Sequence, residues 1–530
     1  MTPDPEPLSG DRSVTCNCRL LSRVRSLRRP RTLGGIDDST GASAPQYCGI
    51  PYATLPKRWT RSTLKTSWNN DRHDGTKLGN DCPRPYSEDD DTDDLVPVPP
   101  APHFPDPPKT DELTGLVMNI VIPFGPTSNN QKLPVMVYVH GGSLLYGGAN
   151  LPIFDAVNLV SQSLKMDAPI ICVNFNYRVG LGGFLASEAI RRELQQDGFQ
   201  GCGNFGFTDQ QLAAAHPPRF RRAVCMSGLS VSIPPWDMEQ HEALFQAVCR
   251  YFTIDASRPD VLDYLREIPQ QDLANATPAN QGVLSGTGNP CLDGWFYKGD
   301  PCEIRTAPDW LEALMVGDTY HEGIIFHLNL LDDDFASIRR TLLNYIHNVN
   351  ETDQILMDYG IFQDLSHDML LERVEHMCGD AIFKIPNYVT AFENPVLDNM
   401  GALFLYHFDQ RSRLENALEG MAYHAHELLY LFKNLANKMS DEENSMAEAF
   451  AAAWIRFCNG HAPWRASKGE WKVWGPDSVQ AIKSEEEDEA VRSYTRMKRI
   501  LAMGGGKTWK RWLAGVDALV NKRMNMGKAA

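Results

Sequence analysis

Five apolar runs, each bounded by turn residues, constrain the fold of this sequence more than any other feature. They lie at 116–123, 133–142, 168–180, 221–228 and 310–323. Unbroken runs of this kind predict strands that are buried on both faces of a sheet. Helical patterns such as 241–252 and 260–268 separate them. Strands that alternate with helices predict an α/β fold with a mostly parallel central sheet flanked by helices.

The chain divides into a short extension and one large domain. Residues 1–45 contain an Arg-rich stretch but no apolar core of a secretory signal, so we expect a disordered or atypical N-terminal extension. Residues 46–530 form the domain. Within it, 87–108 turns acidic and then proline-rich, which predicts an exposed loop. The last third is mostly helical, as at 368–392 and 489–503, with a further strand expected at 401–409.

Composition and charge exclude several classes of function. The net charge of −16 argues against a nucleic-acid partner, because neutralising phosphates requires a basic face and the dense basic cluster at 19–31 is short. No apolar run is long enough to span a bilayer, so we expect no membrane span. The GGGKT stretch at 504–508 lacks the first glycine of a phosphate loop, and Leu501 stands in its place. We therefore expect no nucleotide there, and the oligomeric state stays open.

Two glycines directly follow the second predicted strand. The stretch VYVHGGSLLYGG spans 137–148 and places Gly141 and Gly142 at the strand's end. Glycine lets backbone N–H groups turn towards a developing oxyanion. A strand followed by two glycines is also a common tight turn, so this stretch alone predicts either structure.

Further motifs follow in a consistent order. They are CGIPYATLP at 48–56, GNDCPRP at 79–85, VNFNYRVGLGGFLAS at 173–187, GNFGFTDQQLA at 203–213 and CLDGWFYKGDP at 291–301. With the glycine loop, they resemble the type B carboxylesterase/cholinesterase family of α/β-hydrolases. The resemblance implies that 46–530 is a carboxylesterase-like domain with Gly141 and Gly142 in its oxyanion hole. It also implies that a small-molecule carboxylic ester is hydrolysed through an acyl-enzyme, without a cofactor or metal.

The resemblance implies two members of a catalytic triad. GDTYHEG matches the family's acid loop and implies Glu322 as the carboxylate that orients the base. YHAHELLYLF implies His424 as the base, with Glu427 as a structural neighbour. Such a base accepts the nucleophile's proton while a buried carboxylate holds its tautomer. Two nearby histidines do not fit the motif: His321 and His426.

The third member, a nucleophilic serine, is missing. In the family, a helix, a turn, a strand ending in G-x-S-x-G and another helix separate the motifs found here at 205–213 and 220–228. In this chain a seam at 214–218 joins them directly, and no G-x-S-x-G occurs. We therefore expect the nucleophile strand and its flanking helices to be absent.

Three side chains near the expected site are candidate substitutes for the serine. Ser143 lies on the glycine loop, whereas Cys225 and Ser227 lie on the strand after the seam. The resemblance implies that Ser227 is a hydrogen-bonding neighbour of the acid. None of them occupies the strained strand-to-helix turn that exposes a nucleophile, so we expect none to replace it.

The missing strand has structural consequences. We expect its gap between the runs 171–177 and 222–227, where neighbouring backbone groups either stay unpaired or close up. We also expect Glu322 and His424 to face the two glycines across an empty position. Uncovered apolar sheet surface predicts marginal folding or aggregation.

Three interpretations of the function remain. The first is an ester hydrolase recorded as an incomplete gene model or splice form, inactive as written. The second is a non-catalytic binding or adhesion member of the family, and the third is a pseudogene-like product that does not fold. The resemblance implies that Cys82 and Cys249 have lost their disulfide partners, which favours the cytoplasm. Secretion stays open if the recorded start is not the native one.

Overall fold

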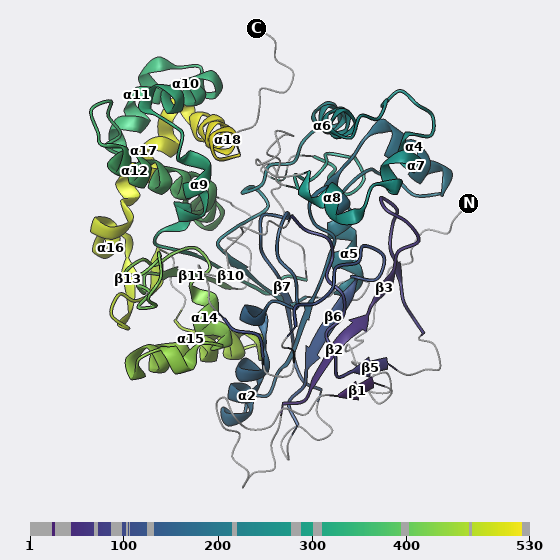
Figure 1. The fold of residues 1–530 in the computed structure, drawn as a ribbon. Helices are drawn as coiled ribbons and strands as arrows, with labels where there is room; N and C mark the ends of the chain where they lie inside the picture. Colours follow the sequence, from purple (N-terminus) through teal and green to yellow (C-terminus); the bar gives the residue numbers. More distant parts are fainter. Residues whose placement is uncertain are drawn as a thin grey trace.

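The structure is a computed structural model, shown in Figure 1. It describes residues 24–26, 44–67, 73–85, 98–101, 104, 106–124, 132–214, 220–276, 288–299, 301, 310–393, 402–465 and 469–521. Most of the predicted extension at 1–45, most of the predicted loop at 87–108 and most of the seam at 214–218 therefore lie outside the described residues.

The longer strands form two sheets. The first has the order β2 (Gln46–Pro51), β6 (Val117–Val121), β8 (Ile171–Phe175) and β7 (Val135–Val139). The second has the order β9 (Arg222–Met226), β10 (Ala313–Thr319), β11 (Ala402–Phe408), β12 (Glu470–Trp474) and β13 (Gln480–Ser484). These bounds confirm all five apolar runs, and the run at 401–409, as strands.

The pairing is parallel in the middle of the molecule and antiparallel at its two outer ends. β7 is parallel to β8, and β9 to β12 are parallel to one another. β6 is antiparallel to both β8 and β2, and β13 is antiparallel to β12. The architecture is therefore α/β with a mixed sheet flanked by helices. Shorter strands form two small pairs: β1 (Val24–Ser26) with β5 (His73–Gly75), and β3 (Ala53–Thr54) with β4 (Thr63–Leu64).

The structure corrects one of the two strands that we expected to flank the gap: β9 is an edge strand as expected, but β8 is not. We expected the gap beside 171–177, but β8 is paired on both sides, with β6 and with β7. Within the described residues, the first sheet ends at β2 and β7 and the second at β9 and β13. Of these four edge strands, β7 and β9 are the two that are parallel to their single neighbours. The reason is that β8 follows β7 in the chain but is inserted between β6 and β7 in the sheet. This order leaves β7, and not β8, at the end of the first sheet.

The burial of these strands agrees with the open edges. In β7, Val135 and Val139 are 42% and 44% exposed, and every residue of β9 is partly exposed. By contrast, all seven residues of β10 are buried. Apolar strands in the middle of an α/β sheet are ordinarily covered on both faces. The apolar side chains of β7 and β9 are therefore more exposed than is usual for central strands of an α/β sheet.

One face of both sheets is covered by the same three helices. They are α2 (Val157–Lys165), α14 (Glu427–Phe432) and α15 (Asp441–Cys458). Their apolar side chains pack in one core with Cys172 of β8 and Met315 of β10, and Tyr138 of β7 and Met226 of β9 pack against it. This core joins the two sheets on that side.

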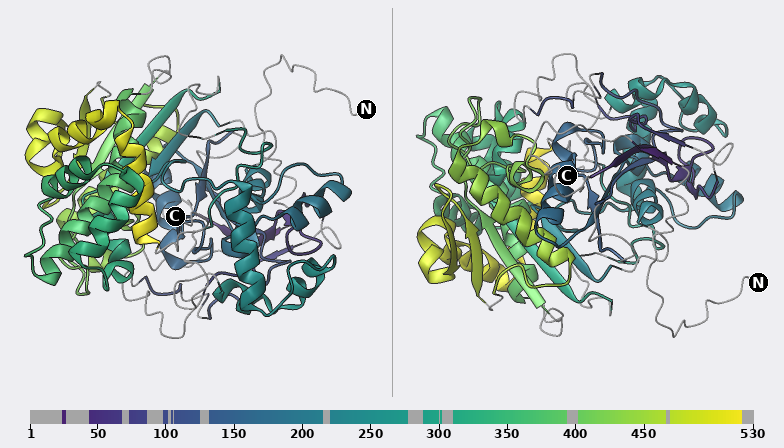
Figure 2. Two further views of the ribbon diagram at one scale, coloured as in Figure 1. Left: turned by 90° about the horizontal axis from the view of Figure 1, so that it is seen from above. Right: turned by 90° about the horizontal axis from the view of Figure 1, so that it is seen from below.

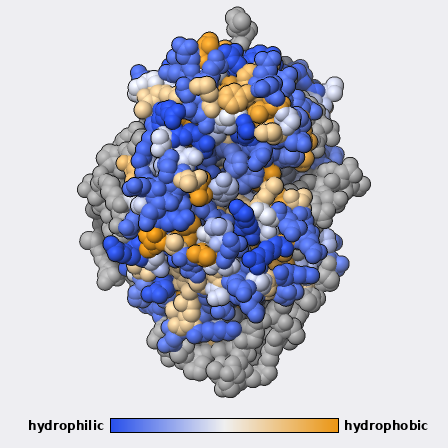
Figure 3. Space-filling view, turned by 90° about the vertical axis from the view of Figure 1, so that its left-hand side faces the viewer, coloured by the Kyte–Doolittle hydropathy of each residue, from blue (hydrophilic) through white to orange (hydrophobic). Residues whose placement is uncertain are grey.

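The other long helices form two separate groups. Over the second sheet lie α10 (Phe335–Ile346), α11 (Val349–Asp358), α12 (His367–Gly379), α17 (Tyr494–Ala502) and α18 (Thr508–Val520). A second group packs around a core of its own: α4 (Glu188–Gln196), α6 (Met238–Tyr251), α7 (Val261–Glu267) and α8 (Gln270–Asn275). Figure 2 shows the first group (green and yellow) and the second group (teal) on opposite sides of the molecule when it is seen from above. The outer surface on the side of the second sheet is mostly hydrophilic, with smaller hydrophobic areas (Figure 3).

The remaining helices are short or irregular. They are α3 (Gly180–Phe184), α5 (Phe205–Ala213), α9 (His327–Leu330), α13 (Ile385–Tyr388) and α16 (Glu485–Arg492). Two π-helical turns, Asp380–Lys384 and Val389–Glu393, interrupt the helix expected at 368–392. The helix expected over 489–503 is broken at Ser493, whose φ of 53° separates α16 from α17.

Candidate active site

The glycine loop begins where β7 ends. Gly142 has a φ of 119°, and a Cβ there would come within 2.6 Å of the backbone of Tyr146. The N–H groups of Leu145 and Tyr146 donate to the Gly142 carbonyl at 2.9 and 2.8 Å, which closes the loop into a tight turn. Gly141 has open space around it. Both glycines are exposed, and neither amide donates to another described residue.

A buried histidine supports this loop from behind. The ring of His140 stacks on Tyr177 at 4.3 Å, and the Tyr177 hydroxyl donates to the His140 carbonyl at 2.9 Å. Nδ1 of His140 lies 3.0 Å from the Gly141 carbonyl and therefore carries the proton. Burial lowers the pKa of His140 to about 4, so the ring is neutral at neutral pH. His140 thus supports the loop as a neutral hydrogen-bond donor.

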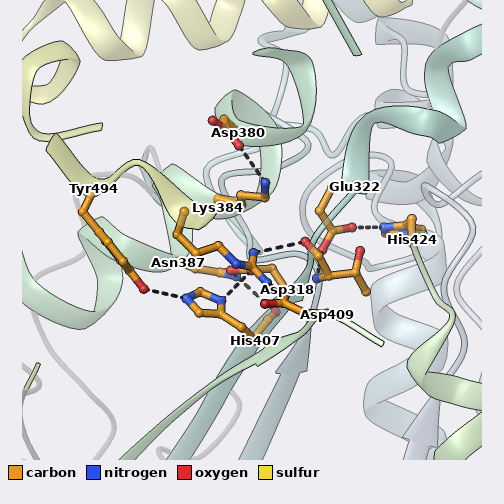
Figure 4. Close-up of polar contacts among 12 residues, drawn as sticks. Asp318, Glu322, Asp380, Lys384, Asn387, His407, Asp409, His424 and Tyr494 are labelled. Carbon is orange, nitrogen blue, oxygen red and sulfur yellow. Dashed lines mark hydrogen bonds and ion pairs between the residues drawn. The ribbon is translucent and has the colours of Figure 1, made fainter. Parts of the chain in front are cut away.

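Glu322 and His424 lie in direct contact (Figure 4). Glu322 begins a 3₁₀ turn, Glu322–Phe326, just after β10, and its side chain is fully buried. One carboxylate oxygen lies 2.5 Å from Nδ1 of His424, and the other accepts from the Thr319 N–H at 2.6 Å. A carboxylate with both oxygens engaged holds its partner's ring in one orientation.

The backbone explains why these two side chains meet. The His321 N–H donates to the Ala422 carbonyl at 2.8 Å, and His321 and Tyr423 form an isolated parallel bridge. Each residue of this bridge directly precedes a member of the pair, so the bridge sets Glu322 opposite His424. The structure therefore brings together the two residues that the sequence motifs singled out.

The environment of His424 makes it a stronger base than an ordinary histidine. Its side chain is 24% exposed and packs on the ring of Phe383 at 5.0 Å. Burial lowers the pKa of His424, but the charge of Glu322 and the hydrogen bond to it outweigh burial and raise the pKa above its usual value. Because Nδ1 is held by Glu322, Nε2 is the nitrogen left to accept a proton.

The two neighbouring histidines face other partners. Nδ1 of His426 lies 3.0 Å from the Gln410 carbonyl, and burial lowers the pKa of His426 to about 4. Nε2 of His321 faces the buried carboxylate of Glu375 at 3.4 Å. Neither ring therefore occupies the place that His424 holds beside Glu322.

Glu427 is a buried acid next to this pair. Burial, and then the charge of Glu322, raise the pKa of Glu427 to about 8. Its Oε2 has no hydrogen-bond partner in the described part of the chain. At neutral pH Glu427 is therefore mostly a neutral carboxyl group, as expected of a structural neighbour.

Within the described residues, none of the three possible substitutes for the serine forms a hydrogen bond with His424. The Oγ of Ser227 is buried without a partner among the described residues, so the expected hydrogen bond to Glu322 is not formed. Burial raises the pKa of Cys225 to about 11, which keeps the thiol protonated. Ser143 lies on the exposed glycine loop with a φ of 55°.

A buried charged cluster that the sequence analysis missed lies next to Glu322. Its centre is Asp318 of β10, which contacts His407 and Asn387 (Figure 4). Asp318 also accepts a hydrogen bond from Arg492. These residues are far apart in the sequence and follow no motif spacing. A charged residue inside an apolar strand, as Asp318 is, was the available signal.

Across the ranges that the structure describes, no three side chains are grouped to hold a metal ion. Within the same ranges, no helix is long and apolar enough to cross a membrane.

Comparison with known proteins identifies the family. The model of the carboxylesterase family matches residues 31–216 and 213–501, so this chain belongs to that family. Lipase 3 of Yarrowia lipolytica is 26% identical over 458 residues, covering 79% of this chain and 85% of the relative. A solved structure of a PNB esterase matches the fold with a TM-score of 0.65 and 22% identity, covering 88% of this chain and 97% of its own.

A further relative is named as lacking activity. The inactive carboxylesterase-like protein VdtD of Byssochlamys spectabilis is 24% identical over 420 residues, covering 67% of this chain and 72% of the relative.

The alignments also bear on the seam. The family model matches in two pieces that meet at residues 213–216, where the sequence motifs are joined directly. The alignment with Lipase 3 runs over 458 positions, yet 79% of a 530-residue chain is fewer residues than that. Some positions of the relative therefore have no counterpart in this chain.

Proposed function

We propose that this chain is a form of a carboxylic ester hydrolase that has lost its nucleophile segment and is inactive as it stands. The observation that carries the proposal is an intact Glu322–His424 pair next to two open strand edges, β7 and β9. The break in the family match at residues 213–216 lies in the segment that leads into β9.

In the complete enzyme, the missing segment supplies a strand between β7 and β9 and a serine at its end. Both edges belong to strands whose paired neighbours are parallel to them, so a parallel strand fits between them. It would also cover the exposed side chains of Val135 and Val139. This placement explains why the two edges are open in the present chain.

The roles of the remaining residues follow from their geometry. Glu322 holds Nδ1 of His424, so that Nε2 takes the proton of the serine hydroxyl as the hydroxyl attacks the ester carbonyl. The exposed amides of Gly141 and Gly142 stabilise the oxyanion. The alcohol leaves with a proton from His424, and a water activated by the same ring then hydrolyses the acyl-enzyme.

A second candidate is a non-catalytic binding member of the family. It is supported by the relative that is named as inactive. In that case the open edges and the Glu322–His424 pair would persist in a protein that never hydrolyses an ester. A product that does not fold is the third candidate, supported by the exposed apolar edge of β7.

The test is to read the genomic and transcript sequence between the codons for Ala215 and Pro217. An in-frame stretch that encodes G-x-S-x-G supports the first candidate, and the protein that includes it should label with a serine-directed fluorophosphonate. An uninterrupted exon would overturn the first candidate. Cooperative unfolding of the present chain would then select the binding protein over the non-folding product.

A further inference from the structure

Asp318 is the centre of the buried cluster beside Glu322. One of its oxygens lies 2.8 Å from Nδ1 of His407 and 2.7 Å from Nη1 of Arg492. The other accepts from Nδ2 of Asn387 at 3.1 Å. All four residues are buried. A buried carboxylate with this many donors is held in one position, because any movement leaves a charge or donor unpaired.

The protonation states of this cluster follow from its contacts. Burial alone would raise the pKa of Asp318, but His407 and Arg492 hold it well below its usual range. Burial and the charge of Arg492 lower the pKa of His407. A neutral His407 donates from Nδ1 to Asp318 and accepts at Nε2 from the Tyr494 hydroxyl at 2.9 Å. The cluster therefore contains Arg492 as its cation and Asp318 and Asp409 as its anions.

Arg492 and Tyr494 enter the cluster from the C-terminal part of the chain. Arg492 is the last residue of α16 and Tyr494 is the first of α17. Between them, the left-handed backbone of Ser493 turns the chain so that both side chains point inward. Arg492 also pairs with Asp409, just after β11. One guanidinium thus ties β10, β11 and the C-terminal helices together.

Thr319 connects this cluster to the acid of the candidate active site. Its carbonyl accepts from Nη1 of Arg492 at 3.3 Å, and its N–H donates to Glu322 at 2.6 Å. Arg492 therefore fixes Thr319 through its carbonyl, and Thr319 fixes one oxygen of Glu322 through its amide. The other oxygen of Glu322 is then free to hold His424.

We propose that Arg492 is a positioning residue for Glu322, acting through Asp318 and the Thr319 backbone to aim the carboxylate at His424. Its catalytic meaning rests on the proposed function, but the geometric claim does not. The titration of His424 reports the contact directly, because Glu322 is its partner at Nδ1. Glu427 is the other titratable group that acts on His424, and it gains its charge only towards its own raised pKa of about 8.

The sign of the change separates positioning from a simple charge effect. Removing the Arg492 cation, with Glu322 unmoved, would raise the pKa of His424, since a nearby positive charge opposes protonation. Losing the Glu322–His424 contact would lower that pKa. The two effects have opposite signs. A fall in the pKa of His424 therefore indicates that Glu322 has moved, because removal of the Arg492 charge alone would raise this pKa.

The experiment is an NMR titration of histidine-labelled protein, carried out on the chain as it exists. Arg492→Gln should lower the pKa of His424 towards the ordinary value of about 6.5. Arg492→Lys keeps the cation but not the forked contact, so it should lower the pKa by less. Arg496→Gln is the matched control, because Arg496 binds Asp380 at 2.8 Å instead and should leave His424 unchanged.

The outcomes decide the proposal independently of any hydrolysis. A rise or no change in the pKa of His424 in Arg492→Gln overturns it, and so does an equal fall in Arg496→Gln. If Arg492→Gln does not fold, Arg492→Lys decides alone in the same way. Absence of esterase activity in a restored protein would count against the proposed function but would leave this result standing.

Discussion

The backbone N–H of Ser227 donates to the carbonyl of Gly317 at 2.9 Å, which extends the pairing of β9 with β10 one residue beyond the end of β9. β9 is thus firmly paired on one side, while its other edge is open among the described residues. The same holds for β7, which is paired with β8 along its whole length. In the part of the chain that the structure describes, these open edges therefore belong to well-formed strands and not to frayed ones.

The chain as it stands should not react with a serine-directed fluorophosphonate. No serine in the described part of the chain contacts His424 as a nucleophile must. Hydrolysis of p-nitrophenyl acetate should likewise not exceed that of a His424→Ala control. Labelling that mass spectrometry assigns to Ser143 or Ser227 would show that a substitute nucleophile exists.

Replacing Glu322 with Gln should lower the pKa of His424. The substitution removes the charge that raises this pKa and leaves the effect of burial, which lowers it. NMR titration of the labelled ring measures the change. Glu375→Gln is a suitable control, because Glu375 lies near His321 and His327 instead. An unchanged titration in Glu322→Gln would contradict the contact.

Glu427→Gln should stabilise the protein at neutral pH but not at acidic pH. The unfolded chain loses this proton near pH 4.5, whereas the folded protein keeps it up to about pH 8. Between these values the folded state binds more protons, so the free energy of unfolding falls by about 1.4 kcal/mol per pH unit. Glu427→Gln has no carboxyl group at this position and does not lose this stability. Denaturant unfolding at pH 5 and pH 7.5 should show that the variant's gain in free energy of unfolding over the unchanged protein is larger at pH 7.5. An equal difference at both pH values would refute the prediction.

Gly142→Ala should destabilise the glycine loop, and Gly141→Ala should not. The φ of 119° at Gly142 and the nearby backbone of Tyr146 leave no room for a Cβ, whereas Gly141 has nothing within 4 Å. We expect a loss of about 1–3 kcal/mol in the free energy of unfolding for Gly142→Ala. Equal unfolding midpoints for the two variants would show that the loop does not require this conformation.

Val135→Lys on β7 should reduce aggregation with little loss of stability. Val135 is 42% exposed at an open edge, and a lysine there opposes edge-to-edge pairing. Val316→Lys in buried β10 is the contrasting variant and should prevent folding, because it buries an unpaired charge. Light scattering and thermal unfolding measure the two effects. Unchanged scattering in Val135→Lys would show that this edge does not drive association.

The sequence was sufficient for the strands and for the Glu322–His424 pair, but not for the order of the strands. Apolar runs predict strands because the pattern is local. The order of the motifs identifies the family's acid loop, which contains Glu322, and the segment that contains His424. Which strand lies beside which depends on how each crossover packs, so the gap was placed beside β8 instead of β7. The hydrogen bond expected between Ser227 and Glu322 is also not formed.

The cluster around Asp318 was beyond reach for a related reason. It joins β10, β11 and the α16–α17 junction, and only the folded chain brings these segments together. The break at Ser493 was missed because serine is tolerated within a helix, and nothing in the sequence marks its left-handed backbone.

The core formed by α2, α14 and α15 is shared by the two sheets and connects them on one face. Because both sheets depend on this core, heat or denaturant should not unfold one sheet alone, and the molecule should unfold in a single transition. Below that transition, fluctuations should separate the facing edges of the two sheets, so that solvent reaches β7 and β9 before it reaches β8 and β10.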